Sequence, residues 1–550
     1  MNRQSKWILW LILLVALSLR LGWLVTHSQT ADIEGEGSEY ARLADNLRTG
    51  NGYVGIFNLG PQLMFPPLYP ILIASFSLIT GEAELAGRLV SLIMGTCLVV
   101  PVFFMALQIY GRRTAFIAAS LVAAHPVLVK LSAEVYSEAL YPTLLMGGVY
   151  WSLRSLEFEN SRNNVLSGAF FGLAYLTRPE AIVYPFLVGM AIFAVAVMNR
   201  LKPKQVVPCL ARMAVPFVLL AAPYVGYLSI QTGQIRVEGK SDINYLIGRR
   251  MNSGMNYLQA AYGIDETLTE QGPFLMGNLA AIESVGNRSL REVAQYLVSA
   301  AKRNGKVLFQ ILSTSRRFGS PILIVLVTLC FFRKTWSHKR LIQEGLLLVI
   351  VSSIFLILLS VQHFWERYAF PFLPFLILWA SNGIAEISEW AEDTTRSISC
   401  MRLGRSKLIR IASQWAVSIM LVLFAMSGMA DEVGMFHGGK SHIKEAGLWL
   451  RNYLPGPKTV MDVGGVIPYY AGGSWVALPY AESSLALKYI AYKRPQFIVL
   501  SRGGSGITPY MDEWIGNGIP DKNAKLIYST GTAPQEKIMI YQLDTSSGGQ

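Results

Sequence analysis

Charged residues are scarce in this chain. They make up 15% of its 550 residues, whereas soluble domains carry about 25%. Hydrophobic residues make up 52%, and the mean hydropathy is +0.38. This composition excludes an intrinsically disordered chain, which needs low hydrophobicity. It also argues against a cytosolic globular protein and favours a protein with several membrane-spanning helices.

Signatures of metal and nucleotide sites are missing as well. The four cysteines are far apart and form no CxxC pair, so neither a disulfide framework nor a cysteine metal site is expected. No HxxxH or HExxH pairing suggests zinc. Nothing combines a Rossmann-like unit with phosphate-binding glycines on the cytoplasmic side. We therefore expect no required cofactor and no nucleotide-sugar site, and nothing supports a divalent metal.

Long apolar runs are abundant. A membrane helix needs about 20 mostly apolar residues, and the first such run follows Arg3 and Lys6. No small-residue cleavage site comes after it, so we expect a retained helix rather than a signal peptide. The eleven expected spans lie near 7–25, 85–110, 114–130, 138–156, 165–177, 180–198, 213–230, 319–332, 344–361, 366–383 and 408–428. The sequence thus predicts an α-helical polytopic membrane protein.

The net charge of +13 is concentrated in short clusters between these runs. If the N-terminus is cytoplasmic, alternation places every short basic cluster on the inside, as the positive-inside rule requires. The first outer loop, 27–84, then holds two basic and seven acidic residues. A second long loop, 231–318, also falls outside. The pattern predicts a multi-pass protein of the inner (plasma) membrane and gives no reason to expect nucleic acid as a partner.

The tail 431–550 has a different character from the preceding residues 1–430. It holds 11 basic and 10 acidic residues, and short β-rich runs alternate with helical ones. Amphipathic helices are expected at 442–454 and 483–493. Strands are expected at 459–463, 475–479, 497–501, 524–528 and 538–542. With eleven spans before it, this tail forms a small extracytoplasmic α/β domain.

The first outer loop holds the densest group of carboxylates. Tyr40 and Leu47 belong to a helical spacing that predicts a short helix over 37–48 at the membrane surface. Four acidic residues precede this helix or begin it: Asp32, Glu34, Glu36 and Glu39. In a structural interpretation they are stabilised by the helix dipole. In a functional interpretation they provide a general base or a cation site at the outer interface.

Several motifs occur in an order that resembles the GT-C glycosyltransferases. The subgroup it most resembles contains bacterial relatives of the protein O-mannosyltransferases and of the lipid A aminoarabinose transferase. The resemblance covers residues 7–430 and rests on the acidic loop with PPLYP (66–70), GRRTAFIAASLVAAHPVLVKLSAEVYSEALYPTLL (111–145), GLAYLTRPEAIVYP (172–185) and ERYAFPFLPF (366–375). It implies a GT-C-like membrane domain that carries the active site.

The resemblance also assigns roles to acidic residues. Such enzymes take a sugar from a polyprenyl-phosphate carrier and invert its anomeric centre. Glu36, four residues before Tyr40, matches the acidic residue of the first loop that serves as the catalytic base or binds the acceptor, with Glu34, Glu39 and Asp32 as alternatives. Glu138 matches a second acidic position, although it also suits a structural ion pair. Residues of the substrate loop are Tyr40, Pro66, Pro67 and Tyr69.

A lipid phosphate as leaving group calls for cations at the outer interface. Arg367, with His363 and Tyr368 beside it, and Arg178 in the RPE turn are the expected phosphate-binding residues, because arginine contacts phosphate through two donors without a metal. Arg20 is a further candidate. The alternative for each arginine is that its side chain extends to lipid headgroups.

The sequence therefore predicts an inverting glycosyltransferase whose partners are a polyprenyl-phosphate-linked sugar, membrane lipids, and a glycan, lipid or protein acceptor. The identities of the sugar and of the acceptor stay open. One alternative is a secondary transporter, which usually places ionisable residues within spans and has repeated halves. Another is an envelope assembly protein that binds a partner through the folded tail.

Overall fold

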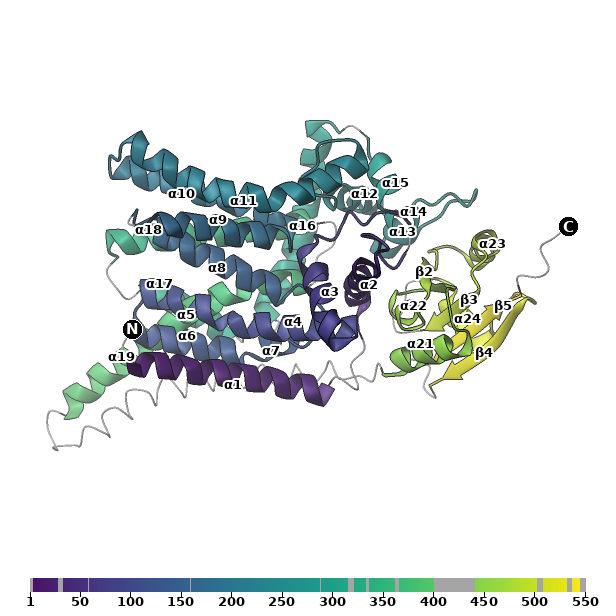
Figure 1. The fold of residues 1–550 in the computed structure, drawn as a ribbon, viewed down its shortest axis with the longest axis horizontal. Helices are drawn as coiled ribbons and strands as arrows, with labels where there is room; N and C mark the ends of the chain where they lie inside the picture. Colours follow the sequence, from purple (N-terminus) through teal and green to yellow (C-terminus); the bar gives the residue numbers. More distant parts are fainter. Residues whose placement is uncertain are drawn as a thin grey trace.

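The computed structural model describes residues 3–27, 33–57, 59–158, 160–286, 288–314, 321–332, 336–361, 366–399, 441–501, 508–531 and 537–544. Long helices form a bundle, and the tail forms a small sheet domain beside one end of that bundle (Figure 1). Among the described residues, six helical segments are long and apolar enough to cross a membrane. The chain is a polytopic α-helical membrane protein with a small C-terminal α/β domain.

The bundle helices coincide with the apolar runs of the sequence. Ten of the eleven expected spans fall on described helices, and the run 408–428 lies outside the described residues. The helices are α1 (Arg3–His27), α4 (Ala83–Cys97), α5 (Val99–Ile109), α6 (Arg112–Ala124), α7 (Pro126–Leu131), α8 (Leu140–Ser155), α9 (Ser161–Tyr175), α10 (Val183–Met198), α11 (Pro203–Thr232), α17 (Pro321–Phe332), α18 (His338–Ser360) and α19 (Leu373–Ser399).

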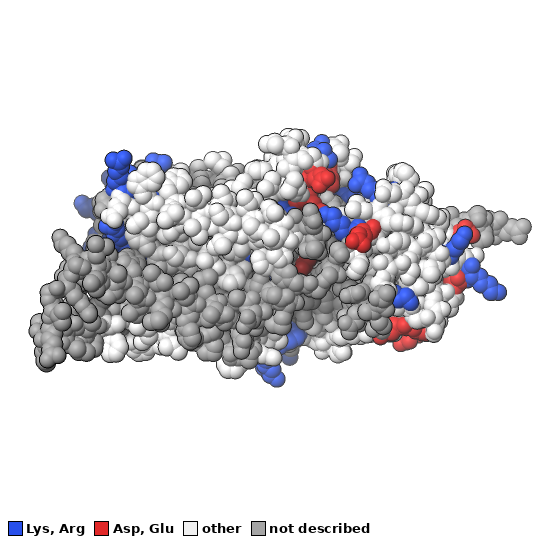
Figure 2. Space-filling model, turned by 90° about the horizontal axis from the view of Figure 1, so that it is seen from below, with Lys and Arg blue, Asp and Glu red and all other residues white. Residues whose placement is uncertain are grey.

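The charged surface is divided along the bundle. Figure 2 shows an uncharged stretch of described surface along the helices, with basic side chains gathered at one end and charges of both signs at the other. A band without charge is what a hydrocarbon environment requires, because charged side chains are costly there. The band therefore fits the six long apolar helices.

Short helices cover the end of the bundle that faces the sheet domain. They are α2 (Gly35–Thr49), α3 (Leu68–Thr80), η1 (Pro179–Ile182), α12 (Ser241–Asn252), α13 (Tyr257–Tyr262), α14 (Pro273–Met276), α15 (Asn278–Glu283), the longer α16 (Leu290–Thr314), and η3 (Glu366–Phe372). The expected helix 37–48 is present as α2, which buries Tyr40, Leu43 and Ala44.

The C-terminal domain is a three-layer α/β unit. Its mixed sheet has the order β2-β1-β3-β5-β4, in which β1 is parallel to β2 and β3, and β5 is antiparallel to β3 and β4. All five expected strands and both expected helices are present. The elements are α21 (Ser441–Tyr453), β1 (Thr459–Asp462), α22 (Val466–Tyr470), β2 (Ser474–Ala477), α23 (Ser483–Lys493), β3 (Phe497–Ser501), α24 (Met511–Asn517), β4 (Ala524–Thr530) and β5 (Ile538–Leu543).

Polar contacts join this domain to the bundle. Glu84 at the start of α4 accepts hydrogen bonds from Lys444 Nζ and from the Tyr470 hydroxyl, both at 3.0 Å. The same Tyr470 oxygen accepts a hydrogen bond at 2.9 Å from the backbone N–H of Ile33, just before α2. These contacts place the carboxyl ends of β1 and β2 beside the first loop (Figure 1).

Candidate active site

Two cavities open between the short helices and meet at one carboxylate. Cavity 1 has a volume of about 500 Å³ and lies between α2, the 257–278 segment and the C-terminal domain. Cavity 2 has a volume of about 410 Å³ and lies between η1, α16 and the end of α18. Glu36, Lys240 and Tyr368 line both of them. This junction is where groups held in the two cavities would come into contact.

Glu36 lies in the first turn of α2, where a negative charge is favoured by the helix N-terminus. Its carboxylate accepts a hydrogen bond from Arg367, which precedes α19 and also lines cavity 1. Burial alone would raise the pKa of Glu36, but the charges of Arg367, Lys240 and Arg178 outweigh it and lower the pKa below its ordinary value. Glu36 is therefore ionised at neutral pH.

Close backbone approach fixes the start of α2. A Cβ on Gly37 would lie 2.8 Å from Ile33 Cγ1 and 3.0 Å from the Val135 carbonyl oxygen. Only glycine allows α2 to pack this closely against the 132–139 segment, which carries Glu138. The residue after Glu36 thus positions it without contributing a second carboxylate.

Glu138 lies behind Arg178 rather than on a cavity wall. Its Oε1 accepts a hydrogen bond at 2.6 Å from Arg178 NH2, and its side chain is 1% exposed. Arg178 itself lines cavity 2 and also donates through Nε to Ser137 Oγ at 3.2 Å. The structure thus joins two predicted site residues as an ion pair in which Glu138 holds Arg178 against the cavity.

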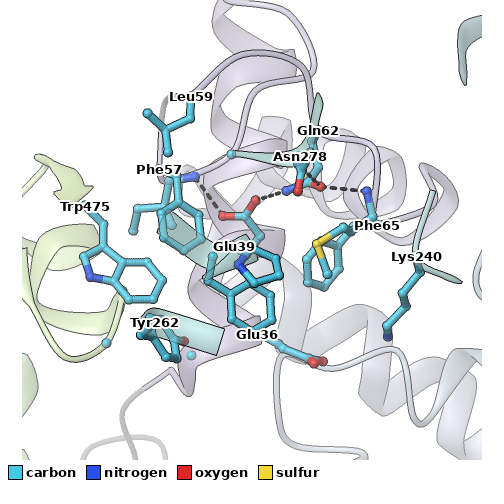
Figure 3. Close-up of a pocket in the computed structure, with 18 of the residues that line it drawn as sticks. Glu36, Glu39, Phe57, Leu59, Gln62, Phe65, Lys240, Tyr262, Asn278 and Trp475 are labelled. Carbon is cyan, nitrogen blue, oxygen red and sulfur yellow. Dashed lines mark hydrogen bonds between the residues drawn. The ribbon is translucent and has the colours of Figure 1, made fainter. Parts of the chain in front are cut away.

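The other acidic residues of the first loop have different surroundings. Glu39 is buried and accepts hydrogen bonds from the Ile56 N–H at 2.7 Å and from Gln62 Nε2 (Figure 3). Gly55 packs directly on its carboxylate, since a Cβ there would overlap Oε1. Burial is the main reason that the pKa of Glu39 is raised. Both oxygens of the Glu39 carboxylate are engaged in these hydrogen bonds, so Glu39 supports the wall of cavity 1.

Glu34 lines cavity 1 and accepts a hydrogen bond at 2.6 Å from the Tyr136 hydroxyl. The Tyr136 ring in turn lies 5.3 Å from the Arg367 guanidinium carbon. Glu34 therefore borders the Glu36–Arg367 pair. Two predicted site residues, Asp32 and His363, lie outside the described residues.

The remaining predicted residues divide between the cavities and the core. Tyr368 lines both cavities, while Tyr40 and Pro66 line cavity 2. Pro67 is the N-cap of α3. The predicted substrate-loop residue Tyr69 is fully buried, is hydrogen-bonded to Ser91 Oγ at 2.8 Å, and lines neither cavity 1 nor cavity 2.

Arg20 belongs to the core, not to a phosphate site. It is fully buried in α1 and donates to the carbonyl oxygens of Val122 at 3.1 Å and Ala123 at 2.8 Å. These carbonyls end α6, whose backbone stops at His125 because Pro126 begins a new helix. Arg20 thus caps a helix C-terminus, and it neither reaches lipid headgroups nor lines a cavity.

Several site residues carry no sequence signal. Lys240 lines both cavities, and its ammonium nitrogen lies 5.7 Å from the centre of the Tyr368 ring. Gln62 and Asn278 extend the Glu39 hydrogen-bond chain, with Asn278 Nδ2 donating to Gln62 Oε1 at 2.8 Å. For Lys240, the one indication in the sequence is its position in the long loop 231–318, which is expected to lie outside. Among the described residues, no group of three or more His, Cys, Asp or Glu side chains is arranged to hold a metal ion.

Comparisons with known proteins agree with this architecture. Residues 65–227 match a family model described as dolichyl-phosphate-mannose-protein mannosyltransferase. No curated protein matches the chain in sequence. The structure resembles the apo form of the oligosaccharyltransferase of Archaeoglobus fulgidus with a TM-score of 0.61 and 13% identity, over 100% of this chain and 75% of that one. It resembles ArnT from Cupriavidus metallidurans, bound to undecaprenyl phosphate, with a TM-score of 0.57 and 13% identity over 99% of both chains.

The chain has the GT-C glycosyltransferase fold. The predicted fold class is therefore confirmed, including the small C-terminal sheet domain. Within the GT-C fold, both cavities lie at the end of the bundle that carries α2, α3 and the C-terminal domain (Figure 1).

Proposed function

We propose that the protein is an inverting glycosyltransferase that moves a sugar from a polyprenyl-phosphate carrier to an acceptor. The observation that carries this proposal is the meeting of two cavities at Glu36, beside Lys240 and Arg367. A transferase needs a donor and an acceptor side by side, with a base at the acceptor oxygen and cations at the leaving group. Two separate cavities that share a carboxylate and a lysine supply this arrangement.

Cavity 2 suits the lipid donor. Its walls from η1, α16 and α18 are largely aliphatic, with contributions from Ile182, Val293, Leu297, Ile357, Leu358 and Val361. Its polar lining holds three cations, Arg178, Lys240 and Arg288, beside the carboxylates of Glu36, Glu180 and Glu238, and Lys240 lies at the junction. An apolar wall with cations beside it fits a lipid phosphate, since the phosphate needs charge-assisted donors and the chain needs apolar surface. In support, ArnT was solved with undecaprenyl phosphate and the archaeal oligosaccharyltransferase with a dolichol-phosphate.

The chemical step follows from these positions. The acceptor hydroxyl oxygen forms a bond to the anomeric carbon, and the bond from that carbon to the phosphate oxygen breaks. The electron pair leaves with the lipid phosphate, whose charge Arg178 and Lys240 of cavity 2 neutralise, with Arg367 on the cavity 1 side of the junction. Glu36 takes the hydroxyl proton, because its carboxylate is ionised and lies at the junction. Glu138 acts as a positioning residue through Arg178.

We propose a cytoplasmic N-terminus, which puts both cavities and the C-terminal domain outside. The support is the segregation of short basic clusters in the sequence. A reporter fused after residue 550 should be active only in an extracytoplasmic compartment. Activity of that fusion in the cytoplasm would show that the orientation is inverted.

The transferase proposal is tested with purified protein in nanodiscs. Undecaprenyl-phosphate mannose and undecaprenyl-phosphate glucose are supplied in turn with a cell-envelope extract as acceptor source. Release of undecaprenyl phosphate from one of them, dependent on Glu36, is the expected result. Facilitated solute uptake into liposomes without any such release would favour a transporter instead.

A further inference from the structure

The wall of cavity 1 opposite Glu36 is built from aromatic rings and glycines. Phe57 stacks on Trp475 with ring centres 4.2 Å apart, and Tyr262 lies beside them (Figure 3). Trp475 is held in place, since its Nε1 donates to the Asp462 carbonyl oxygen at 2.9 Å. A Cβ on Gly464 would meet no atom within 4 Å, so the space above that glycine is open. The wall is therefore aromatic: Phe57 covers one face of Trp475, which is 8% exposed, and the open space lies above Gly464.

This wall carries no charge. Among the described residues that line cavity 1, those of the 257–278 segment and of the C-terminal domain include no Asp, Glu, Lys or Arg. The nearest carboxylate in the sequence, Asp462, is buried and accepts the Val463 N–H at 2.7 Å within its own loop. A phosphorylated or otherwise charged group placed on this wall would find no charged partner there, since the cations of cavity 1, Lys240 and Arg367, belong to its other side. The wall thus selects a neutral group.

The same wall offers no strand edge to a peptide. β2 is the edge strand of the sheet on this side. Its outer edge is already occupied, because Trp475 N–H donates to the Ile56 carbonyl oxygen at 2.9 Å and Tyr480 N–H donates to the Tyr262 carbonyl oxygen at 2.8 Å. An extended peptide usually binds a sheet domain by adding a strand to such an edge. That mode is closed at cavity 1.

We propose that this wall is a subsite for neutral sugar rings, so that the acceptor of the transferred sugar is a glycan. This inference rests on the proposed function. Sugar rings present C–H groups on one face, which contact the negative face of an aromatic ring, and hydroxyls at their edges, which need a few polar partners. Phe57 and Tyr262, which are half-buried, supply the faces with Trp475 stacked behind Phe57, and Asn244 and Asn278 supply polar groups on the lining.

The position of the subsite suits the reaction. Cavity 1 is continuous from Trp475 to Glu36, so a sugar stacked on the wall directs a hydroxyl of the acceptor toward the carboxylate. That hydroxyl oxygen bonds to the anomeric carbon as the carbon–phosphate oxygen bond breaks, and its proton passes to Glu36. The lipid phosphate leaves with the electron pair. The aromatic wall therefore positions the acceptor and takes no part in the bond changes.

The first experiment separates acceptor binding from donor use. Full-length protein in nanodiscs is tested with mannotriose, maltotriose and galactotriose, by saturation-transfer NMR without donor and by stimulated release of undecaprenyl phosphate with donor. At least one trisaccharide should bind and stimulate release. Trp475→Leu and Phe57→Leu should each raise the KM for that trisaccharide about tenfold, as expected for a lost aromatic contact. The control is Trp449→Leu, a tryptophan of the same domain that lines neither cavity.

A second variant fills the subsite without removing a contact. Gly464→Leu should abolish saturation transfer to the trisaccharide, because the side chain occupies the open space. Gly516→Leu is the matched control: its Cβ also meets nothing within 4 Å, and it lies in α24 away from both cavities. The control should bind the trisaccharide as the unaltered protein does.

The outcomes separate the two proposals. If no trisaccharide binds, or if Trp475→Leu and Trp449→Leu have the same KM, the sugar subsite is wrong. Stimulation of release only by a serine- and threonine-rich peptide or by lipid A would also overturn it. If a trisaccharide binds but no lipid donor is ever turned over, the subsite stands and the transferase proposal fails.

Discussion

Two clusters that each pair a carboxylate with an arginine lie at opposite ends of the helix bundle, and only one of them lines cavities 1 and 2. Near the C-terminal domain, Glu36 pairs with Arg367, and its side chain remains 26% exposed. At the other end, Glu344 in α18 is fully buried and pairs with Arg340 at 3.7 Å. Both pairs consist of a carboxylate and an arginine. They differ in what surrounds them.

Every contact of the second cluster is internal. Glu344 accepts hydrogen bonds from the Tyr110 hydroxyl at 2.6 Å and from Trp379 Nε1 at 2.9 Å, and Arg340 NH2 donates to the Cys330 carbonyl oxygen at 2.8 Å. A buried pair with several internal hydrogen bonds holds helices in register. The Glu36–Arg367 pair has exposed atoms beside two cavities, so it can still bind a substrate. Access, not burial of charge, distinguishes the site.

Removing the exposed carboxylate should have the largest effect. Glu36→Gln should lower turnover about 10²–10⁴-fold, because the acceptor proton loses its base. Its melting temperature should stay near that of the unaltered protein. The measurement is release of undecaprenyl phosphate at matched protein levels.

Glu34→Gln and Glu39→Gln, measured in parallel, test which carboxylate of the loop acts. Glu39→Gln should reduce stability more than turnover, because its carboxylate accepts two hydrogen bonds inside the wall. Normal turnover of Glu36→Gln together with loss in Glu34→Gln would move the base to Glu34. Full activity in all three variants would contradict the acidic-loop mechanism.

Changing the Glu344–Arg340 pair should lower stability and leave turnover intact, the opposite of the effect expected for Glu36. Glu344→Ala leaves Arg340 buried without its partner, which typically costs about 3–5 kcal/mol of stability. Thermal unfolding in detergent should show the loss, whereas the folded fraction should retain its turnover. A loss of turnover without a loss of stability would show that this end of the bundle also serves the reaction.

Much of the fold follows from local sequence, whereas the assembled site does not. Apolar runs and alternating tail segments predict the bundle helices and all five strands, because their periodicity is a local property, whereas α12 to α16 lie in a segment expected only as a loop. Motifs also pointed to Glu36 and Arg367 separately. Their pairing joins residues 331 positions apart, and no local pattern encodes such a contact. The dipole argument treated the loop carboxylates alike, and only the packing of Gly55 and Gln62 distinguishes Glu39.

Replacing Lys240, which lies beside the Glu36–Arg367 pair, should have a smaller effect than replacing Glu36. Lys240→Ala removes a cation from the junction of the cavities and should raise the KM for the lipid donor about 10- to 100-fold, the usual size of a lost charged hydrogen bond. Lys339→Ala is the control, since Lys339 lies at the opposite end of the bundle, 63% exposed and paired with Glu157. Equal donor KM values for the two variants would show that Lys240 does not contact the phosphate.

The smallest expected effect concerns pH. Glu134, beside Lys130 at 3.4 Å, lies near the first loop, and burial raises its pKa from 4.5 to about 7. The folded protein therefore holds this proton more tightly than the unfolded chain. The stability that Glu134 contributes is full below pH 4.5 and is lost as the pH rises to about 7. Glu36 has the opposite sign: its lowered pKa contributes stability above pH 4.5 that is lost as the pH falls further.

Between pH 4.5 and 7, the melting temperature of the unaltered protein should thus fall more steeply than that of Glu134→Gln. Parallel slopes for the two proteins would mean that Glu134 is hydrated in the folded state, and the cavity end would then be more open to water than its packing indicates.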